Sequence, residues 1–132
     1  MAEGWARYVF GVSLRIEPAS TGVTVDPDTV ECRLYRRADP PGADGWLFFR
    51  DNLWRGELND PEHFRSLVAE ELGVTVTDVE FRSMETDEEY LNDLRAAIDA
   101  DLDAFRADSP REAVHKYLGS SIQVRERPDG ER

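Results

Sequence analysis

The residues best suited to binding chemistry lie in one aromatic stretch, GWLFFRDNLWRGEL, at positions 45–58. Within it, Arg50, Trp54 and Arg55 combine two guanidinium groups with an indole ring. An arginine fork beside a tryptophan can hold a carboxylate or a phosphate while the guanidinium stacks on the ring. These three residues are therefore the candidate anion-binding residues of the chain.

Both arginines also have a structural alternative. The chain has 28 acidic residues, and an arginine near a core often pairs with an acid of its own chain, such as Asp51 or Glu57. We expect this internal pairing, and the sequence leaves open whether the tryptophan and the second arginine lie in the core or at the surface. If they bind an external anion instead, Lys116 and the Ser120–Ser121 pair are the neighbours expected in the site.

Little else in the sequence indicates catalysis. No phosphate-binding glycine loop, zinc-ligand spacing, nucleophile elbow or paired-histidine motif is present, so we expect neither a metal site nor a cofactor. His63 and His115 are the only imidazoles. We interpret both as surface residues, because a catalytic histidine needs a partner that tunes it, and the sequence reveals none. Whether the protein is an enzyme stays open, and no catalytic residue is nominated.

The charge balance indicates the environment and excludes one class of partner. The chain carries 28 acidic and 16 basic residues, a net charge of −12, and 15 of the 16 basic residues are arginine. Such an acidic, lysine-poor composition suits molar salt, where the Debye length falls to about 3 Å and self-repulsion is screened. We therefore interpret the protein as halophilic. Nucleic acid is not an expected partner, because high salt steeply weakens phosphate contacts.

Length and hydropathy predict one soluble domain. The 132 residues suffice for a single hydrophobic core, and we expect one domain over 1–132 with short polar tails at 1–6 and 126–132. No apolar run approaches the roughly 18 residues that a membrane span needs. The first ten residues lack the regions of a signal peptide. We therefore expect a cytoplasmic protein that does not enter a membrane.

Alternating side chains predict the first two strands. Residues 8–17 alternate apolar and other side chains, which indicates a strand with one buried face. Val30, Cys32 and Leu34 alternate in the same way, so a second strand is expected at 30–35 with the cysteine facing the core. The proline- and glycine-rich run that follows predicts a surface loop.

The aromatic stretch itself is harder to assign. Residues 46–50 suit a strand, and 51–52 could then be a tight turn or a bulge that redirects the chain. The sequence does not decide between these two alternatives.

Capping residues and periodicity predict three helices. Asp60 followed by Pro61 begins one that runs to about Leu72 and ends at Gly73. Its predicted buried stripe is Phe64, Leu67, Val68 and Leu72.

The second and third helices begin at capping boxes. Thr86 with Glu89 begins the longest helix, and Ser109 with Glu112 begins a short one that closes at Gly119. The predicted buried stripe of the long helix is Leu91, Leu94, Ile98, Leu102 and Phe105.

Two further strands complete the predicted order. Residues 74–83 form a strand whose apolar phase shifts near Asp78, which indicates a bulge, and 121–125 form a last strand. The order of elements favours an α+β fold, a mostly antiparallel sheet with about three helices covering one face.

Three segments give the chain a resemblance to a known family. They are DPDT at 26–29, DGWLFFRDNLWRGELND at 44–60 and HKYLGSSIQV at 115–124. With them the chain resembles the haloarchaeal LWR-salt family, named after the tripeptide seen here as Leu53-Trp54-Arg55, over about 8–124. The resemblance implies a cytoplasmic protein of salt-adapted archaea, and it transfers no activity, cofactor or catalytic residue.

Two classes of function fit these observations. The first is a small interaction or regulatory module with a protein partner or a second copy of itself. The second is a small-molecule or anion-binding protein, or an enzyme, that uses Arg50, Trp54 and Arg55. A concave pocket lined by these side chains would favour the second class, whereas a flat, exposed apolar patch would favour the first.

Overall fold

Four strands form the main sheet of the computed structural model, which describes residues 4–128. They are β1 (Ala6–Arg15), β2 (Thr29–Arg37), β5 (Thr75–Thr86) and β6 (Ile122–Val124), in the order β2-β1-β5-β6. β1 pairs antiparallel with β2 and β5, whereas β6 runs parallel to β5. A separate hairpin joins β3 (Leu53–Trp54) to β4 (Glu57–Leu58). The expected α+β fold with a mostly antiparallel sheet is confirmed.

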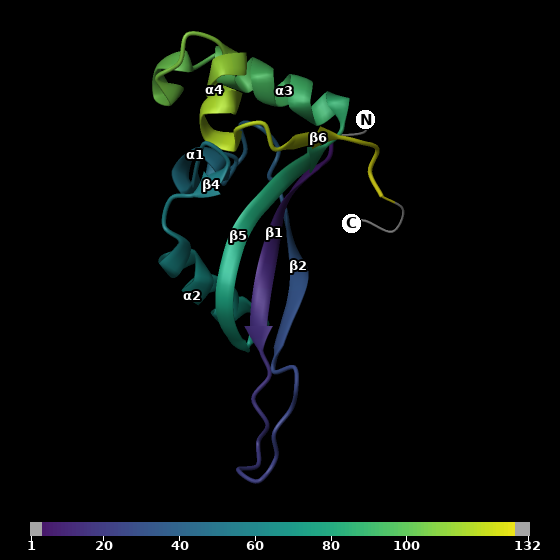
Figure 1. The fold of residues 1–132 in the computed structure, drawn as a ribbon. Helices are drawn as coiled ribbons and strands as arrows, with labels where there is room; N and C mark the ends of the chain where they lie inside the picture. The colour runs from purple at the N-terminus through teal and green to yellow at the C-terminus, as the bar shows by residue number, and fades with distance from the viewer. Residues whose placement is uncertain (1–3, 129–132) are drawn as a thin grey trace.

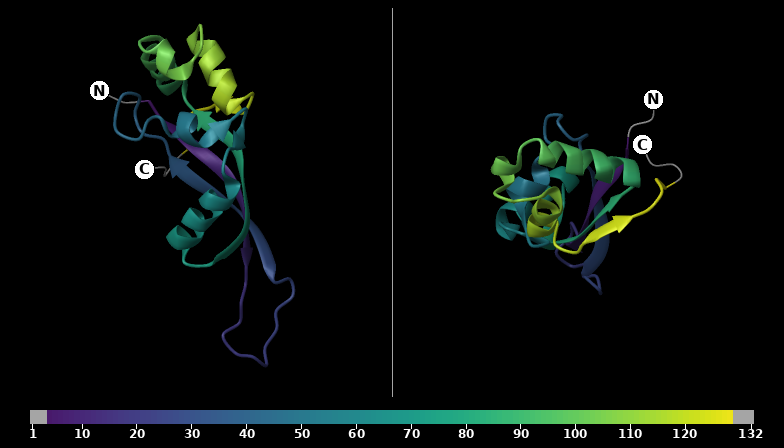
Figure 2. Two further views of the ribbon diagram at one scale, coloured as in Figure 1. Left: turned by 90° about the vertical axis from the view of Figure 1, so that its left-hand side faces the viewer. Right: turned by 90° about the horizontal axis from the view of Figure 1, so that it is seen from above.

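The helices gather along the sheet and at one end of it. They are α1 (Phe48–Asn52), α2 (Pro61–Leu72), α3 (Glu88–Asp99) and α4 (Pro110–Leu118), with a 3-10 turn, η1, at Leu102–Phe105. In Figure 1, α2 lies beside the lower half of β5, α1 lies above it, and α3 and α4 lie at the upper end of the sheet. Figures 1 and 2 both show the 16–28 loop extending well beyond the helices.

Aromatic rings fill the space between the sheet and the nearest helices. The Tyr8 ring lies 4.7 Å from the Phe48 ring, and the Phe10 ring lies 4.8 Å from the Phe64 ring, between centroids. Burying rings of this size dominates the energetics of a small core. The stretch at 45–58 is therefore central to the fold, as its composition indicates.

The predicted strand at 46–50 is wrong, because residues 48–52 form α1. The Asn52 Nδ2 donates to the Phe48 carbonyl at 3.0 Å and closes the single turn. Neighbouring side chains differ by about 100° around a helix but alternate between opposite faces of a strand. Phe48 therefore packs against the sheet while Phe49 stacks on Phe105, at 5.8 Å and 7° between planes. Asp51 and Asn52 form neither a turn nor a bulge but end the helix.

β1 is buried on both faces over its first seven residues, not on one face as expected. It is an inner strand, and long side chains cover the face without helices. The Arg7 guanidinium lies 3.9 Å from the centre of the Tyr35 ring, and the Arg82 side chain lies over Gly11, where a Cβ would be 2.6 Å from its Nε. The bulge expected near Asp78 is confirmed by a register shift between Asp78 and Val76.

The expected burial of Cys32 is wrong, although its register is right. Cys32 pairs with the buried Val12, so both side chains lie on the helix-bearing face. However, β2 is an edge strand, and the cysteine is exposed. The predicted buried stripe of α2 is wrong at two positions for the same reason. Leu67 and Leu72 are 42% and 39% exposed because they point toward this uncovered edge region.

Two of the three helix starts are confirmed. Asp60 Oδ1 accepts from the His63 amide at 3.2 Å, and Ser109 Oγ accepts from the Glu112 amide at 3.2 Å. Gly73 ends α2 with a φ of 69°, in the left-handed region that favours glycine.

The long third helix differs from its prediction at both ends. Its cap is Asp87, which accepts from the Tyr90 amide at 2.8 Å, because Thr86 still belongs to β5 and bonds the Trp5 carbonyl. The helix stops at Asp99, and the last two members of the predicted stripe lie in η1.

The structure describes only part of the predicted polar tails at the two chain ends. Trp5 and Ala6, expected in a polar tail, are buried, and Ala6 begins β1. Residues 1–3 and 129–132 of the predicted tails lie outside the described residues.

Candidate anion-binding site

A tight hairpin places Trp54 and Arg55 at the surface. Leu53 pairs with Leu58, and both are buried, so the alternation of the strand turns the indole outward. Arg55 and Gly56 form the two-residue turn with φ values of 53° and 81°. Positive φ at both central residues is the pattern of a type I′ hairpin, in which asparagine and glycine are preferred. An arginine at the first position is therefore unusual for this turn.

The turn docks on the C-terminal end of α4. The Arg55 amide donates to the Lys116 carbonyl and the Gly56 amide to the Tyr117 carbonyl, both at 2.9 Å. Carbonyls in the last turn of a helix lack intrahelical partners, and the hairpin supplies them. Gly119 allows this approach, because a Cβ there would lie 3.1 Å from the Arg55 carbonyl oxygen. These contacts hold the arginine in a conformation that costs about 1 kcal/mol or more.

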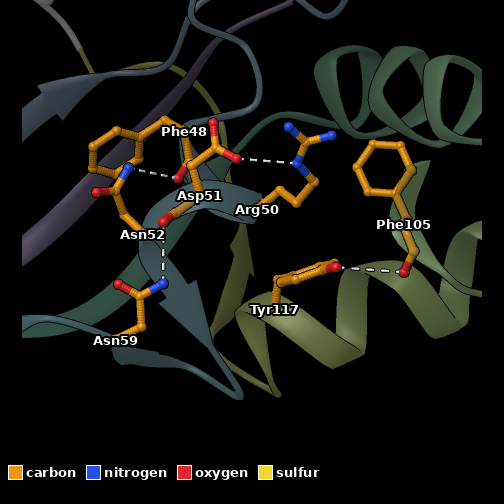
Figure 3. Close-up of polar contacts among 7 residues, drawn as sticks. All are labelled: Phe48, Arg50, Asp51, Asn52, Asn59, Phe105 and Tyr117. Atoms are coloured by element: carbon orange, nitrogen blue, oxygen red, sulfur yellow. Dashed lines mark hydrogen bonds and ion pairs between the residues drawn. The ribbon is translucent and has the colours of Figure 1, made fainter.

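Two hydrogen bonds from Asn59, one from its side chain and one from its backbone, tie the hairpin to α1. The Asn59 Nδ2 donates to the Asp51 carbonyl at 3.1 Å, and the Asn59 amide donates to the Asn52 carbonyl at 3.0 Å. Figure 3 shows the side-chain bond beside the ion pair of Arg50 and Asp51. The position of the hairpin is therefore fixed from two sides, by α1 and by α4.

The indole ring of Trp54 is the aromatic surface of the site. It is 45% exposed and lies edge-on to the Tyr117 ring, at 6.0 Å between centroids. The Arg55 Cζ lies 5.6 Å and the Lys116 Nζ 5.8 Å from the indole centroid. Both distances fall within the roughly 6 Å range of cation–π attraction. One ring thus holds two cations at the surface of an acidic protein.

A hollow of about 490 Å³ opens beside this ring. It is lined by Trp54, Arg55, Glu112, His115, Lys116, Gly119 and Ser120. Four of the expected members therefore meet: the tryptophan, the second arginine, the lysine and the first serine. Ser121 lies under the turn instead, with its Oγ 3.2 Å from where a Cβ on Gly56 would be.

Lys116 also has a structural function. Its Nζ donates to the Phe105 and Arg106 carbonyls, both at 3.1 Å, and so joins α4 to η1. A compact ammonium can direct separate donors to two carbonyls, whereas a planar guanidinium presents a fixed fork. We therefore assign the positive charge of Lys116 to the site and its hydrogen bonds to the fold.

The two candidate arginines have different surroundings. Arg50 Nε lies 3.1 Å from Asp51 Oδ1, so the internal ion pair expected for it is confirmed (Figure 3). Arg50 does not line the hollow. Within residues 4–128, Arg55 forms no ion pair, neither with Glu57 nor with another acid. Of the two candidates, Arg55 is therefore the one whose guanidinium is available to an external anion.

Two members of the hollow, Glu112 and His115, were not nominated from the sequence. With Lys116 they stand at i, i+3 and i+4 of α4, which places them on one face of the helix, and Gly119 follows directly after its last residue. This spacing is visible in the sequence, but which face meets the hairpin is not. The other histidine, His63, lies on α2 away from the hollow.

Among residues 4–128, no group of three or more histidine, cysteine, aspartate or glutamate side chains could hold a metal ion. The helices of the same residues include none that is long and apolar enough to cross a membrane.

Fold and site together define a small α+β domain with a cation-lined hollow beside an exposed tryptophan. Over residues 4–128 the chain matches the model of the LWR-salt protein family, and it belongs to that family. The comparisons with curated proteins and with solved structures gave no match.

Proposed function

We propose that this protein binds small organic anions in the hollow beside Trp54. The Arg55 guanidinium forms the paired hydrogen bonds that a carboxylate or phosphate accepts. The Trp54 ring packs against a flat apolar part of the same ligand, and Lys116 adds a second positive charge. The proposal assigns binding and no reaction.

The observation that carries the proposal is the state of Arg55. It is exposed, it lies on an indole ring, and no acid within residues 4–128 pairs with it, although the chain has 28 acids. It also occupies a backbone conformation in which asparagine or glycine would be less strained. Apart from the contact with the indole ring, the described residues give no reason for an arginine here, whereas an anionic ligand does.

The hollow favours a small ligand over a flat docking surface. Its volume of about 490 Å³ falls within the roughly 300–1,000 Å³ usual for ligand sites. We infer that the protein works in a salt-rich cytoplasm, as its net charge of −12 indicates. At molar salt single charge contacts are screened, so a ligand that combines an anionic group with a stacking ring binds best.

The test is a titration with three matched probes in about molar potassium chloride: 1-naphthyl phosphate, 1-naphthoate and the uncharged 1-naphthol. The indole N–H resonance of Trp54, assigned with Trp54→Phe, reports binding. We expect the two anions to shift it with saturation and 1-naphthol to bind at least about tenfold more weakly, because a charge-assisted bond contributes about 1.5 kcal/mol or more. Preference for phosphate or for carboxylate would name the ligand class. Equal affinity for all three probes would contradict an anion site.

Two arginine variants separate the site from the general charge of the protein. Arg55→Lys keeps the charge but loses the planar fork, and we expect it to weaken binding of the anions by about tenfold. Arg50→Lys is the matched control, since Arg50 lies in the same stretch outside the hollow. An equal loss in both variants, or in neither, would contradict the assignment to Arg55.

A third variant tests the part of the hollow that α4 lines. Glu112 is the one carboxylate among the residues that line it. Glu112→Gln removes a like charge from the neighbourhood of the bound anion, so we expect a several-fold gain in affinity for 1-naphthyl phosphate. A loss would show that the carboxylate contacts the ligand or holds the site open.

A further inference from the structure

Among the described residues, no strand pairs with the outer edge of β2. β2 is the end strand of the main sheet, and Figure 1 shows no described helix or strand beside its outer side. An exposed edge presents unpaired amides and carbonyls, and most proteins protect it with short strands, prolines or charges. This edge is nine residues long. It therefore has the length to accept a further strand.

The hydrogen bonds to β1 show which residues of β2 face outward. The Ala38 amide donates to the Ala6 carbonyl at 3.0 Å, and the Ile16 amide donates to the Asp28 carbonyl at 2.6 Å. Even-numbered positions of this strand thus bond inward, because hydrogen-bonded pairs alternate along an antiparallel ladder. Odd-numbered positions, 29 to 37, direct their amides and carbonyls to the free edge.

We propose that two copies of this chain associate through this edge, antiparallel, with Cys32 at the two-fold axis. In this register Glu31 of each copy lies opposite Arg33 of the other, on the face without helices. Val30 of each copy lies opposite Leu34 of the other, on the helix-bearing face. Cys32 of one copy lies opposite Cys32 of the other. Opposite charges and apolar side chains directly across strands both stabilise a sheet. The two sheets join into one continuous sheet.

Neighbouring registers are less complementary. An axis at Glu31 places two glutamates opposite each other, and an axis at Arg33 places two arginines opposite each other. Like charges directly across strands are destabilising. An axis at Leu34 places Glu31 opposite Arg37, but it also places Cys32 opposite Arg36. The Arg36 guanidinium already lies 4.5 Å from the centre of the Phe48 ring. Among these registers, the axis at Cys32 alone combines opposite charges on one face with apolar pairs on the other.

The apolar surroundings of the edge support a second copy as the occupant. A groove of about 730 Å³ lies along the helix-bearing side of β2, with Leu34, Leu67 and Leu72 among its lining residues. Val30, on the same face of β2, is 42% exposed. Association extends the sheet over this strip and shields apolar side chains that the monomer leaves in water. The net charge of −12 on each copy opposes association in dilute buffer, so the dimer needs salt.

Thiol cross-linking tests the register. Directly opposite residues in a non-hydrogen-bonded antiparallel pair have Cα atoms about 4.5 Å apart, within the roughly 4.4–6.8 Å that a disulfide spans. In about molar potassium chloride, diamide should therefore oxidise the two Cys32 thiols to one disulfide and take up their hydrogens. In the matched variant Val30→Cys with Cys32→Ala, the two copies of position 30 are about 14 Å apart, so little cross-linking is expected. Equal yields from both proteins, or none from either, would overturn the register.

A charge exchange tests the interface without chemistry on the cysteine. We expect sedimentation equilibrium in molar salt to show a dimer, and Glu31→Arg or Arg33→Glu alone to raise its dissociation constant about tenfold or more. The double variant restores opposite charges across the axis and should recover the dimer, with an unchanged circular dichroism spectrum as the check on folding. A monomer at every concentration, or a dimer insensitive to all three variants, would overturn the proposal.

Discussion

Arg7 and Glu85 form a buried ion pair, with 2.8 Å between Nε and Oε1, on the face of the sheet that carries no helix. The two residues are cross-strand partners in β1 and β5. Arg125 lies 3.6 Å from the second oxygen of the same carboxylate, and the Tyr35 ring lies on the Arg7 guanidinium. A charged cluster, not a second layer of helices, thus covers this side of the inner strand.

We predict that Glu85→Gln destabilises the protein by about 3 kcal/mol, because it removes a buried carboxylate that pairs with both Arg7 and Arg125. The matched control is Glu80→Gln, on the same strand. Glu80 pairs with Arg82 at 2.9 Å, but both side chains are 56% exposed, so its loss should cost less than about 1 kcal/mol. Urea denaturation of both variants measures the difference. Similar costs would show that burial does not decide the strength of the pair.

The backbone conformation at Arg55 predicts that a substitution there can stabilise the fold. Asparagine adopts the left-handed conformation more readily than arginine, so Arg55→Asn should stabilise the fold by about 0.5–1 kcal/mol. The same variant should lose affinity for 1-naphthyl phosphate, if the site is as proposed. Urea midpoints and the probe titration, measured on one preparation, give both values. A destabilised variant would mean that the side chain of Arg55 contributes to the fold.

Local signals in the sequence predicted the elements that depend on local chemistry. The α2 and α4 helices begin at the expected capping residues because a cap bonds an amide only three positions away. α1 was missed because its single turn is stabilised by distant rings, such as Phe105 against Phe49. A helix this short has little stability of its own, so no local signal marks it.

Exposure was predicted less well than register. The spacing placed Cys32 correctly on the helix-bearing face, but its burial depends on which strand lies at the edge, and that is a property of the whole sheet. The site shows the same limit. Trp54 and Arg55 were nominated from their types, whereas His115 and Glu112 became members only through the docking of the hairpin on α4.

Two buried tyrosines predict a loss of stability at alkaline pH. Burial raises the pKa of Tyr8 and of Tyr90 well above the ordinary 10.0, and the Asp39 carboxylate raises the pKa of Tyr90 further. The Tyr90 hydroxyl donates to the Asp39 carbonyl at 2.6 Å. The folded state therefore holds these protons more tightly than the unfolded state does. This contribution is fully present below about pH 10 and is lost as the pH rises further, by up to about 1.4 kcal/mol per pH unit for each tyrosine.

The measurement is urea denaturation as a function of pH above neutrality. Tyr90→Phe should make the alkaline decline in unfolding free energy shallower, since one of the two groups is removed. Tyr35→Phe, at a tyrosine that is 46% exposed, is the control, and we expect its unfolding free energy to decline as that of the parent protein does. An unchanged slope in Tyr90→Phe would contradict the assignment of the decline to this residue.

The net charge of −12 predicts that the fold depends on salt. Exposed acids stand close together on the helices, for example Glu70 and Glu71 in the last turn of α2, where the helix dipole also disfavours negative charge. Screening these charges should raise the thermal midpoint by at least about 5 °C between dilute buffer and molar potassium chloride, equivalent to about 1–2 kcal/mol for a domain of this size.

A variant with two acids replaced by neutral residues separates screening from a general effect of salt on the burial of apolar groups. Glu70→Gln with Glu71→Gln removes two of the repelling charges, so it should gain stability in dilute buffer and little in molar salt. Circular dichroism melts of both proteins across a potassium chloride series measure this convergence. A parent midpoint that stays flat across the series would contradict salt adaptation. Parallel curves for the two proteins would show that salt stabilises the fold by strengthening apolar burial and not by screening its acids.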